Sequence, residues 1–240
     1  MIGIVAVSHS RPLAEAAVDL ALQMGGDEPP SVRVAAGGPD GDLGTDATAI
    51  AEAIDAADSG EGVLVLMDLG SALLSAEMAL EFSAAPERVV LSPAPFVEGL
   101  VSAVVTAAGG GALGEVAAEV ARAADAKRAQ LGATEAVAPA PSPAAPTDDA
   151  LSFETTVINP SGLHARPAAT FVKAASRYDA DVQIEEVGGE APAVSARSLL
   201  ALMALGVRQG ARVRVSASGP QAKDALDDLR SLIDDGFGEV

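Results

Sequence analysis

The stretch IGIVAVSHSRPLAEAAVDLALQM, residues 2–24, determines the architecture expected for the first half of the chain. Its first six residues are continuously apolar, which is typical of a strand buried on both faces, and a helical pattern follows from Pro12 to about Met24. The same alternation continues, with strands expected at 32–36, 62–67 and 88–93 and helices at 45–58, 71–83, 97–108 and 112–130. This spacing predicts an open parallel sheet covered by helices.

Polar side chains follow two of these strands. His9 comes after the first strand, and Asp68 and Ser71 follow the third. Ligands of open α/β sheets bind beyond the carboxyl ends of the strands, and the helix after His9 directs its positive end toward the ring. A carboxylate bonded to one ring nitrogen fixes the tautomer and leaves the other as a nucleophile, so Asp68 is a candidate orienter of His9. Ser8, Ser10 and Ser71 are candidate hydroxyl donors to a phosphate. By spacing alone, a plain loop histidine with Asp68 as a helix cap is equally favoured.

An Ala-Pro-rich segment divides the chain. Residues 132–150, GATEAVAPAPSPAAPTDDA, contain four prolines and no periodic pattern, which predicts a semi-extended linker between domains 1–131 and 151–240. The second domain combines expected strands with expected helices, and a small α+β sandwich fits this order best. Its expected strands are 153–158, 181–187 and 211–218, and its expected helices are 165–177, 195–206 and 221–233.

The other histidine of the chain, His164, stands where the first helix of this second domain begins. Pro167 falls in the first turn, where its missing N–H costs nothing, and the ring therefore faces free amide groups. Helix N-termini attract anions, and Arg166 adds a planar cation. These surroundings suit a ring nitrogen that carries a phosphoryl group and releases it; a capping histidine without a function is the alternative. A wider positive rim is expected from Lys173, Arg177 and Arg197.

Composition excludes several classes of function. The net charge of −19 repels nucleic acid and anionic membranes, so neither is an expected partner. Aromatic residues are only 2%, so the core should consist of small aliphatic side chains. The chain has no cysteine, no basic start to a secretory signal, and no apolar run of the roughly 20 residues that a membrane span needs, so a cytoplasmic protein is expected.

Rival chemistries remain open at this point. Ser71, His9 and Asp68 together would suit a serine hydrolase, although the chain has no G-x-S-x-G elbow. The two histidines lie in separate domains and make a poor metal site, and no P-loop is present, so no metal or other cofactor is expected. A non-catalytic adaptor is a third alternative.

The segment NPSGLHARPAATFVKAASRYDADVQIE, residues 159–185, resembles HPr, the histidine-containing phosphocarrier of the bacterial phosphotransferase system, and the likeness spans about 151–240. The resemblance implies an open-faced α+β sandwich. It also implies that His164 accepts phosphate through its δ nitrogen from phosphorylated enzyme I, with Arg166 assisting. Ser198 lies where some bacteria have a regulatory serine; an ordinary helix N-cap is an equally favoured reading.

The first domain carries a second resemblance, in VSHSRPLAEAAVDLALQM (7–24), AAGGPDGDLGTDA (35–47), VLMDLGSALLSAEMALE (65–81) and APFVEG (94–99). These segments resemble the phosphotransfer subunits of bacterial phosphoenolpyruvate-dependent dihydroxyacetone kinases, whose first domain has the mannose-class enzyme IIA fold. The resemblance implies transfer from His164 to the ε nitrogen of His9, with Asp68 as orienter. It also implies that His9 passes the phosphoryl group to ADP held on the nucleotide-binding L subunit. The ATP that forms there phosphorylates dihydroxyacetone on the K subunit.

The same resemblance leads us to expect a homodimer formed through the first domain and a separate enzyme I as donor, because some members of this class carry an enzyme I-like domain that this sequence does not show. The alternative within this class is a mannose-class enzyme IIA–HPr fusion that serves a sugar permease.

Overall fold

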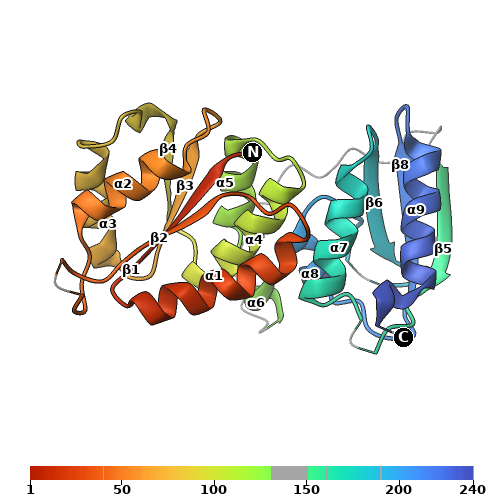
Figure 1. The fold of residues 1–240 in the computed structure, drawn as a ribbon. Helices are drawn as coiled ribbons and strands as arrows, with labels where there is room; N and C mark the ends of the chain where they lie inside the picture. The colour runs from red at the N-terminus through yellow and green to blue at the C-terminus, as the bar shows by residue number, and fades with distance from the viewer. Residues whose placement is uncertain (40, 131–150, 161, 190, 240) are drawn as a thin grey trace. The chain divides into compact units, whose positions relative to one another are not determined.

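The computed structural model describes residues 1–39, 41–130, 151–160, 162–189 and 191–239 (Figure 1). Two compact units make up the chain, Met1–Ala124 and Asp125–Val240. The linker expected at 132–150 lies outside the described residues. No helix of the described part is both long enough and apolar enough to cross a membrane.

The first unit contains the expected parallel sheet, with strand order β2-β1-β3-β4. The strands are β1 (Gly3–Ser8), β2 (Val32–Ala36), β3 (Val63–Met67) and β4 (Val89–Ser92). All six residues of β1 are buried, as its unbroken apolar run predicts for a strand with helices on both sides.

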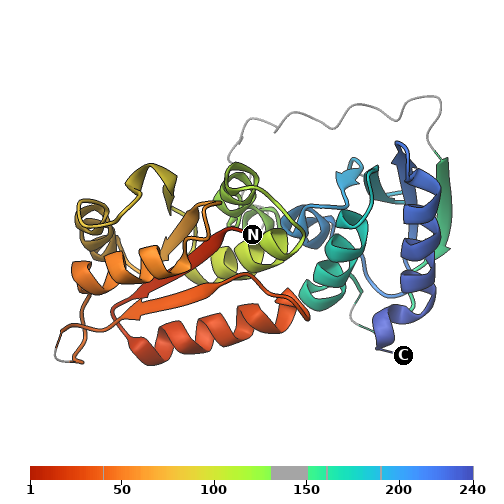
Figure 2. The same cartoon turned by 45° about the horizontal axis from the view of Figure 1, so that its top comes forward.

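Helices cover both faces of this sheet (Figure 2). The chain moves from β1 to β2 in one direction across the sheet and from β2 through β3 to β4 in the other, so right-handed crossovers place the first helix opposite the next two. Accordingly α1 packs with α4, which also packs with α5, and α2 packs with α3. These helices are α1 (Arg11–Gly25), α2 (Ala47–Ala57), α3 (Gly70–Leu80), α4 (Phe96–Ala108) and α5 (Leu113–Ala121).

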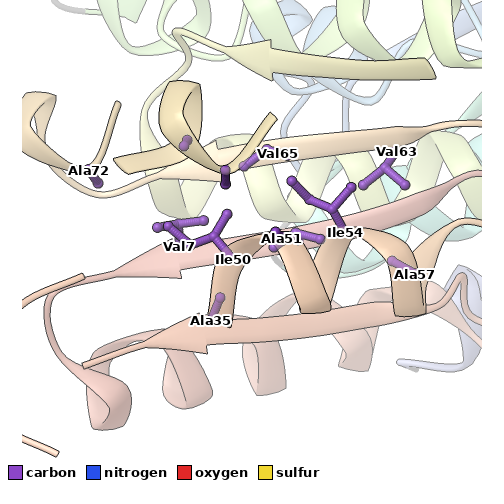
Figure 3. Close-up of a cluster of buried hydrophobic side chains, with 12 residues drawn as sticks. Val7, Ala35, Ile50, Ala51, Ile54, Ala57, Val63, Val65 and Ala72 are labelled. Atoms are coloured by element: carbon purple, nitrogen blue, oxygen red, sulfur yellow. The ribbon is translucent and has the colours of Figure 1, made fainter. Parts of the chain in front are cut away.

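Small aliphatic side chains fill the core, as the composition predicts. Figure 3 shows Ile50, Ala51 and Ile54 of α2 clustered with the sheet residues Val7, Val63 and Val65. The fully buried residues of α3 are alanines, which lets that helix approach the sheet closely.

The reversal of strand order lies between β1 and β3, whose carboxyl ends meet at the same edge of the parallel sheet. Val7 is paired with Met67, and the Asp68 N–H donates to the carbonyl of Val7 at 3.2 Å. The residues that follow these two strands, His9 and Asp68, are therefore neighbours at the switch point, where open α/β sheets bind their ligands.

The second unit contains an antiparallel sheet of order β5-β8-β6-β7, packed with helices as an α+β sandwich. Its strands are β5 (Leu151–Thr156), β6 (Asp181–Glu186), β7 (Val194–Ser195) and β8 (Arg212–Ser218). Its helices are α6 (Asp125–Gln130), α7 (Ala165–Ser176), α8 (Leu199–Leu205) and α9 (Ala222–Asp234), followed by the 3₁₀ turn η2 (Gly236–Gly238). Along β8, buried Val213 and Val215 alternate with exposed Arg212 and Arg214, which bond carboxylates of the neighbouring strands on the open face.

Several boundaries differ from those expected. The helix predicted over 195–206 begins only at Leu199, because Ser195 belongs to strand β7 and Ser198 is the N-cap. The single helix predicted over 112–130 is two helices, α5 and α6, separated by a turn. The helix predicted to end near Ser83 ends at Leu80. The sequence does not predict strand β7, because two residues are too few to show an alternation of apolar and polar side chains.

Candidate functional site

The first site is built on the turn between β1 and α1. His9 follows the strand, and Ser10 is the N-cap of α1 but makes no side-chain capping bond. The N–H groups of Arg11 and Leu13 precede the first intrahelical bond, which Ala14 makes to the Ser10 carbonyl, and they are free to meet an anion. The His9 side chain is 24% exposed, so the ring is accessible while its inner edge is held by the protein.

Asp68 holds that inner edge, as expected. Its Oδ1 lies 3.0 Å from His9 Nδ1, and its Oδ2 accepts the His9 backbone N–H at 2.9 Å. Oδ1 also accepts the Leu69 N–H at 2.7 Å. Because Asp68 bonds the N–H of its neighbour and the N-cap of α3 is Leu69, the reading of Asp68 as a plain helix cap is wrong. The arrangement keeps the ring proton on Nδ1 and the lone pair on Nε2.

Burial and hydrogen bonding oppose each other at this carboxylate. Burial raises the pKa of Asp68, but the bonds from the His9 backbone, the His9 ring, the Ser8 hydroxyl and the Leu69 N–H together outweigh it. The net pKa of Asp68 lies below its ordinary value of 3.8, and the group is an anion at neutral pH.

The three candidate serines differ in position. Ser71, the second residue of α3, places its Oγ 3.0 Å from His9 Nε2, on the accessible side of the ring. Ser10 lines an open cavity of about 500 Å³ beside His9, together with the glycine-rich segment that follows β2. Ser8 is fully buried, and its hydroxyl contacts Asp68. Its expected role as a hydroxyl that donates a hydrogen bond to a phosphate is therefore wrong.

The chain Ser71–His9–Asp68 has the hydrogen-bond order of a Ser-His-Asp triad, which the hydrolase alternative requires. Ser71 stands in the first turn of a helix and not on a strand-to-helix elbow. The geometry alone therefore allows two uses of the same ring: Nε2 as a base for Ser71, or Nε2 as the nucleophile itself.

The second site surrounds His164, the N-cap of α7, which also makes no side-chain capping bond. Pro167 lies in the first turn of α7, as expected. The preceding loop is fixed by Gly162, which has φ +66° and lies so close to Val207 that a Cβ would stand 2.1 Å from the Val207 carbonyl oxygen. Only glycine fits this conformation and this contact together. Leu163 continues the contact by donating its N–H to the same carbonyl at 3.0 Å.

Sequence reasoning missed the carboxylate that holds this ring. Glu239 Oε1 and Oε2 lie 3.3 and 3.4 Å from His164 Nε2, and Oε2 also accepts from Asn159 at 3.2 Å. Buried Asn159 in turn donates to the Gly162 carbonyl at 2.7 Å. The only sequence signal is the Gly-Phe-Gly at 236–238, where Phe237 itself adopts φ +59° and turns the chain after α9.

His164 is therefore oriented in the opposite sense to His9. Its Nε2 faces a carboxylate, and its Nδ1 makes no hydrogen bond within the described chain. Arg166, next to it in the first turn of α7, is exposed and forms no side-chain bond with the described residues, so its guanidinium is available to an anion at Nδ1.

The expected positive rim is smaller than predicted. Arg177 is the C-cap at the far end of α7, about 20 Å from His164 at the helical rise per residue. Arg197 donates to the carbonyls of Tyr178 and Ala180 just beyond that end. Neither can reach an anion at His164. Lys173, in the last turn of α7, lies about 13 Å along the helix from the histidine.

Ser198 is the N-cap of α8, and its Oγ accepts the Ala201 N–H at 3.1 Å. It is 8% exposed, so the ordinary N-cap reading is confirmed. Its phosphorylation stays a prediction. Among the described residues, no group of three or more His, Asp or Glu side chains is arranged to hold a metal ion.

Comparison with known proteins gives separate matches for the two units. The family described as PTS system fructose IIA component matches residues 3–118, and the family described as PTS HPr component phosphorylation site matches residues 151–235. The crystal structure of HPr-C-His from Thermoanaerobacter tengcongensis is 38% identical, covers 38% of this chain and 98% of that one, and superposes with a TM-score of 0.35.

Similarity to two curated relatives runs through both units. Over 249 residues the chain is 40% identical to the PEP-dependent dihydroxyacetone kinase, phosphoryl donor subunit DhaM, of Escherichia coli (strain K12), covering 100% of this chain and 51% of that protein. Identity to the protein of the same description from Pantoea ananatis (strain LMG 20103) is 43% over 244 residues, with the same coverage. The chain spans about half the length of these relatives.

The similarity to these relatives covers both folds that the structure shows, in the same order along the chain. Each of the two folds has its histidine at a helix N-terminus. Over these two domains the chain is similar to the phosphoryl donor subunits of PEP-dependent dihydroxyacetone kinase, with a match to the fructose IIA component family over residues 3–118 followed by a match to the HPr component family over residues 151–235.

Proposed function

We propose that the chain is a phosphohistidine relay, which receives a phosphoryl group from phosphoenolpyruvate through enzyme I on His164, passes it to His9 and delivers it to ADP. The ADP is held on the nucleotide-binding L subunit of a dihydroxyacetone kinase, where the ATP that forms phosphorylates dihydroxyacetone on the K subunit. The names of the curated relatives support this acceptor.

One observation carries the proposal: the two imidazoles are held by opposite nitrogens. Asp68 binds Nδ1 of His9 and leaves Nε2 accessible, whereas Glu239 binds Nε2 of His164 and leaves Nδ1 accessible. A carboxylate on one nitrogen keeps the proton there and makes the other a nucleophile. Each accessible nitrogen also stands at a helix N-terminus without a side-chain cap, which favours a bound phosphoryl group.

The transfer between the rings needs no cofactor. The Nε2 lone pair of His9 attacks phosphorus while the bond from phosphorus to His164 Nδ1 breaks, and the bonding pair returns to that nitrogen. The His9 ring gains positive charge and keeps its proton on Nδ1, where the Asp68 anion stabilises it. In this state Ser71 turns its hydroxyl from Nε2 to a phosphoryl oxygen.

We further propose that the relay works in the cytoplasm as a homodimer formed through the first domain. The absence of cysteine fits a reducing compartment. A mannose-class enzyme IIA–HPr fusion serving a sugar permease would use the same two histidines, so the acceptor has to be identified directly.

The deciding experiment incubates the chain with phosphoenolpyruvate and enzyme I, without any free phosphocarrier, and maps acid-labile phosphate in the wild type, His9→Gln and His164→Ala. We expect label on His164 alone in the His9 variant and no label in the His164 variant. Addition of the K and L subunits with ADP and dihydroxyacetone should then yield dihydroxyacetone phosphate. A wild-type chain that stays unlabelled would refute the relay, and labelling without triose phosphorylation would favour the permease alternative.

A further inference from the structure

Ser8 ends strand β1 immediately before His9, and it is fully buried. Its Oγ lies 2.8 Å from Asp68 Oδ2 and 3.1 Å from the Ser10 carbonyl oxygen, and it accepts the Ser10 N–H at 3.1 Å. A hydroxyl has one proton, so it donates to only one of the two acceptors at a time. The carboxylate is nearer and charged, and charge-assisted bonds are the stronger ones, so the proton goes to Asp68.

This bond completes the set of donors around Asp68. Oδ2 receives the Ser8 hydroxyl and the His9 backbone N–H, and Oδ1 receives the Leu69 N–H and His9 Nδ1. A carboxylate offers about four lone-pair positions, and all four are occupied. The last torsion of an aspartate is soft, so the orientation of the carboxylate plane depends on this complete set of donors.

The His9 ring depends on that plane in turn. Two of the four donors come from His9 itself, and the Leu69 N–H is the neighbouring backbone group, so the Ser8 hydroxyl is the side-chain donor that does not move with the ring. The same hydroxyl also accepts from the N-cap of α1, which ties the carboxylate to the helix end where a phosphoryl group would sit.

We propose that Ser8 is a positioning residue for phosphoryl transfer at His9: its hydroxyl fixes the Asp68 carboxylate in the orientation that keeps the imidazole proton on Nδ1 and aims the Nε2 lone pair at the incoming phosphorus. The inference rests on the proposed role of His9 as a phosphoryl acceptor. Ser8 does not touch the phosphoryl group; it acts only through Asp68.

The test compares Ser8→Ala and Ser8→Thr with the wild type and with Ser102→Ala as a matched control. Ser102 is also fully buried, but its Oγ has no hydrogen-bond partner, so its replacement removes a buried hydroxyl without affecting any bond. The first readout needs no phosphoryl donor: ¹⁵N chemical shifts of the two His9 ring nitrogens at a single neutral pH report which nitrogen carries the proton. The second readout is the single-turnover rate at which a phosphoryl group on His164 of the full chain appears on His9.

We expect Ser8→Ala to shift the His9 ring from the Nδ1–H tautomer to a mixture. It should slow His9 phosphorylation by about tenfold, the lower end of the loss seen when groups that orient metal-binding histidines are removed. Ser8→Thr, which keeps the hydroxyl, should restore the tautomer and most of the rate, and Ser102→Ala should change neither. An unchanged tautomer and rate in folded Ser8→Ala would overturn the assignment. If the wild type never takes a phosphoryl group, the proposed function fails, while the tautomer measurement still decides whether Ser8 orients the ring.

Discussion

Asp68 is joined to His9 twice, once through the ring and once through the backbone: Oδ1 lies 3.0 Å from Nδ1, and Oδ2 accepts the backbone N–H at 2.9 Å. The double attachment couples the orientation of the imidazole to the end of strand β1. It also means that a neutral isostere cannot replace the carboxylate, because all four groups that face its oxygens are donors.

Asp68→Asn tests this relationship. In either orientation the amide NH₂ meets two donors, the Ser8 hydroxyl and His9 N–H on one side or the Leu69 N–H and the ring on the other. The variant also lacks the negative charge that stabilises the ring as it becomes cationic. We expect His9 phosphorylation by the HPr domain to fall by about a hundredfold, measured in single-turnover transfer. Asp55→Asn serves as control, because Asp55 accepts from Ser83 and Ala84 far from the histidine; equal losses in both variants would contradict the assignment.

The dependence of stability on pH provides a second test of Asp68. Because the pKa of the folded carboxyl lies below 3.8, its stabilising contribution is complete above the unfolded value and is lost as the pH falls through the folded pKa. At low pH the protonated carboxyl resembles the amide of Asp68→Asn. Urea unfolding of the two proteins should therefore differ by about 1–3 kcal/mol at pH 7 and by progressively less as the pH falls below 3.8 through the folded pKa. A difference that stays constant below pH 3.8 would show that the carboxylate is not held as described.

Much of the first site was predictable from sequence because parallel strands end at the same edge of a sheet. The apolar runs before His9 and Asp68 place both residues one position beyond paired strands, and the structure shows them in contact. The position of Ser8 next to the histidine predicts a hydroxyl near the phosphate, but both faces of β1 are buried and the Ser8 hydroxyl bonds Asp68 instead.

The carboxylate at the second histidine was beyond sequence reasoning. Glu239 is 75 residues from His164, and the contact depends on a turn at 236–238 in which Phe237 adopts a left-handed conformation that its residue type does not suggest. The charge of Arg197 predicts a member of the positive rim, but its guanidinium donates to two backbone carbonyls beyond the far end of α7.

Ser71→Ala separates the two uses of the His9 ring. If Nε2 is the nucleophile, loss of the Ser71 hydroxyl removes one donor to the phosphoryl group, and His9 phosphorylation should slow by tenfold or less, because the net contribution of a single hydrogen bond is about 1 kcal/mol. If Ser71 is the nucleophile of a hydrolase, the variant would be inactive and the wild type would react with a fluorophosphonate at this serine. Mass spectrometry of the labelled chain distinguishes the two outcomes.

Glu239→Gln tests whether the carboxylate at His164 acts on the ring. The glutamine amide can still accept from Nε2–H but no longer stabilises a cationic ring by charge. Because the contact is 3.3–3.4 Å long and the His164 side chain is 41% exposed, the effect should be modest, about 0.5–1 kcal/mol, or a two- to fivefold slower phosphorylation of His164 by enzyme I. Asp235→Asn removes the same charge four residues earlier, at the exposed C-cap of α9, and should leave the rate unchanged. Equal slowing in both variants would mean that enzyme I senses net charge at this end of the domain and that Glu239 does not orient the ring.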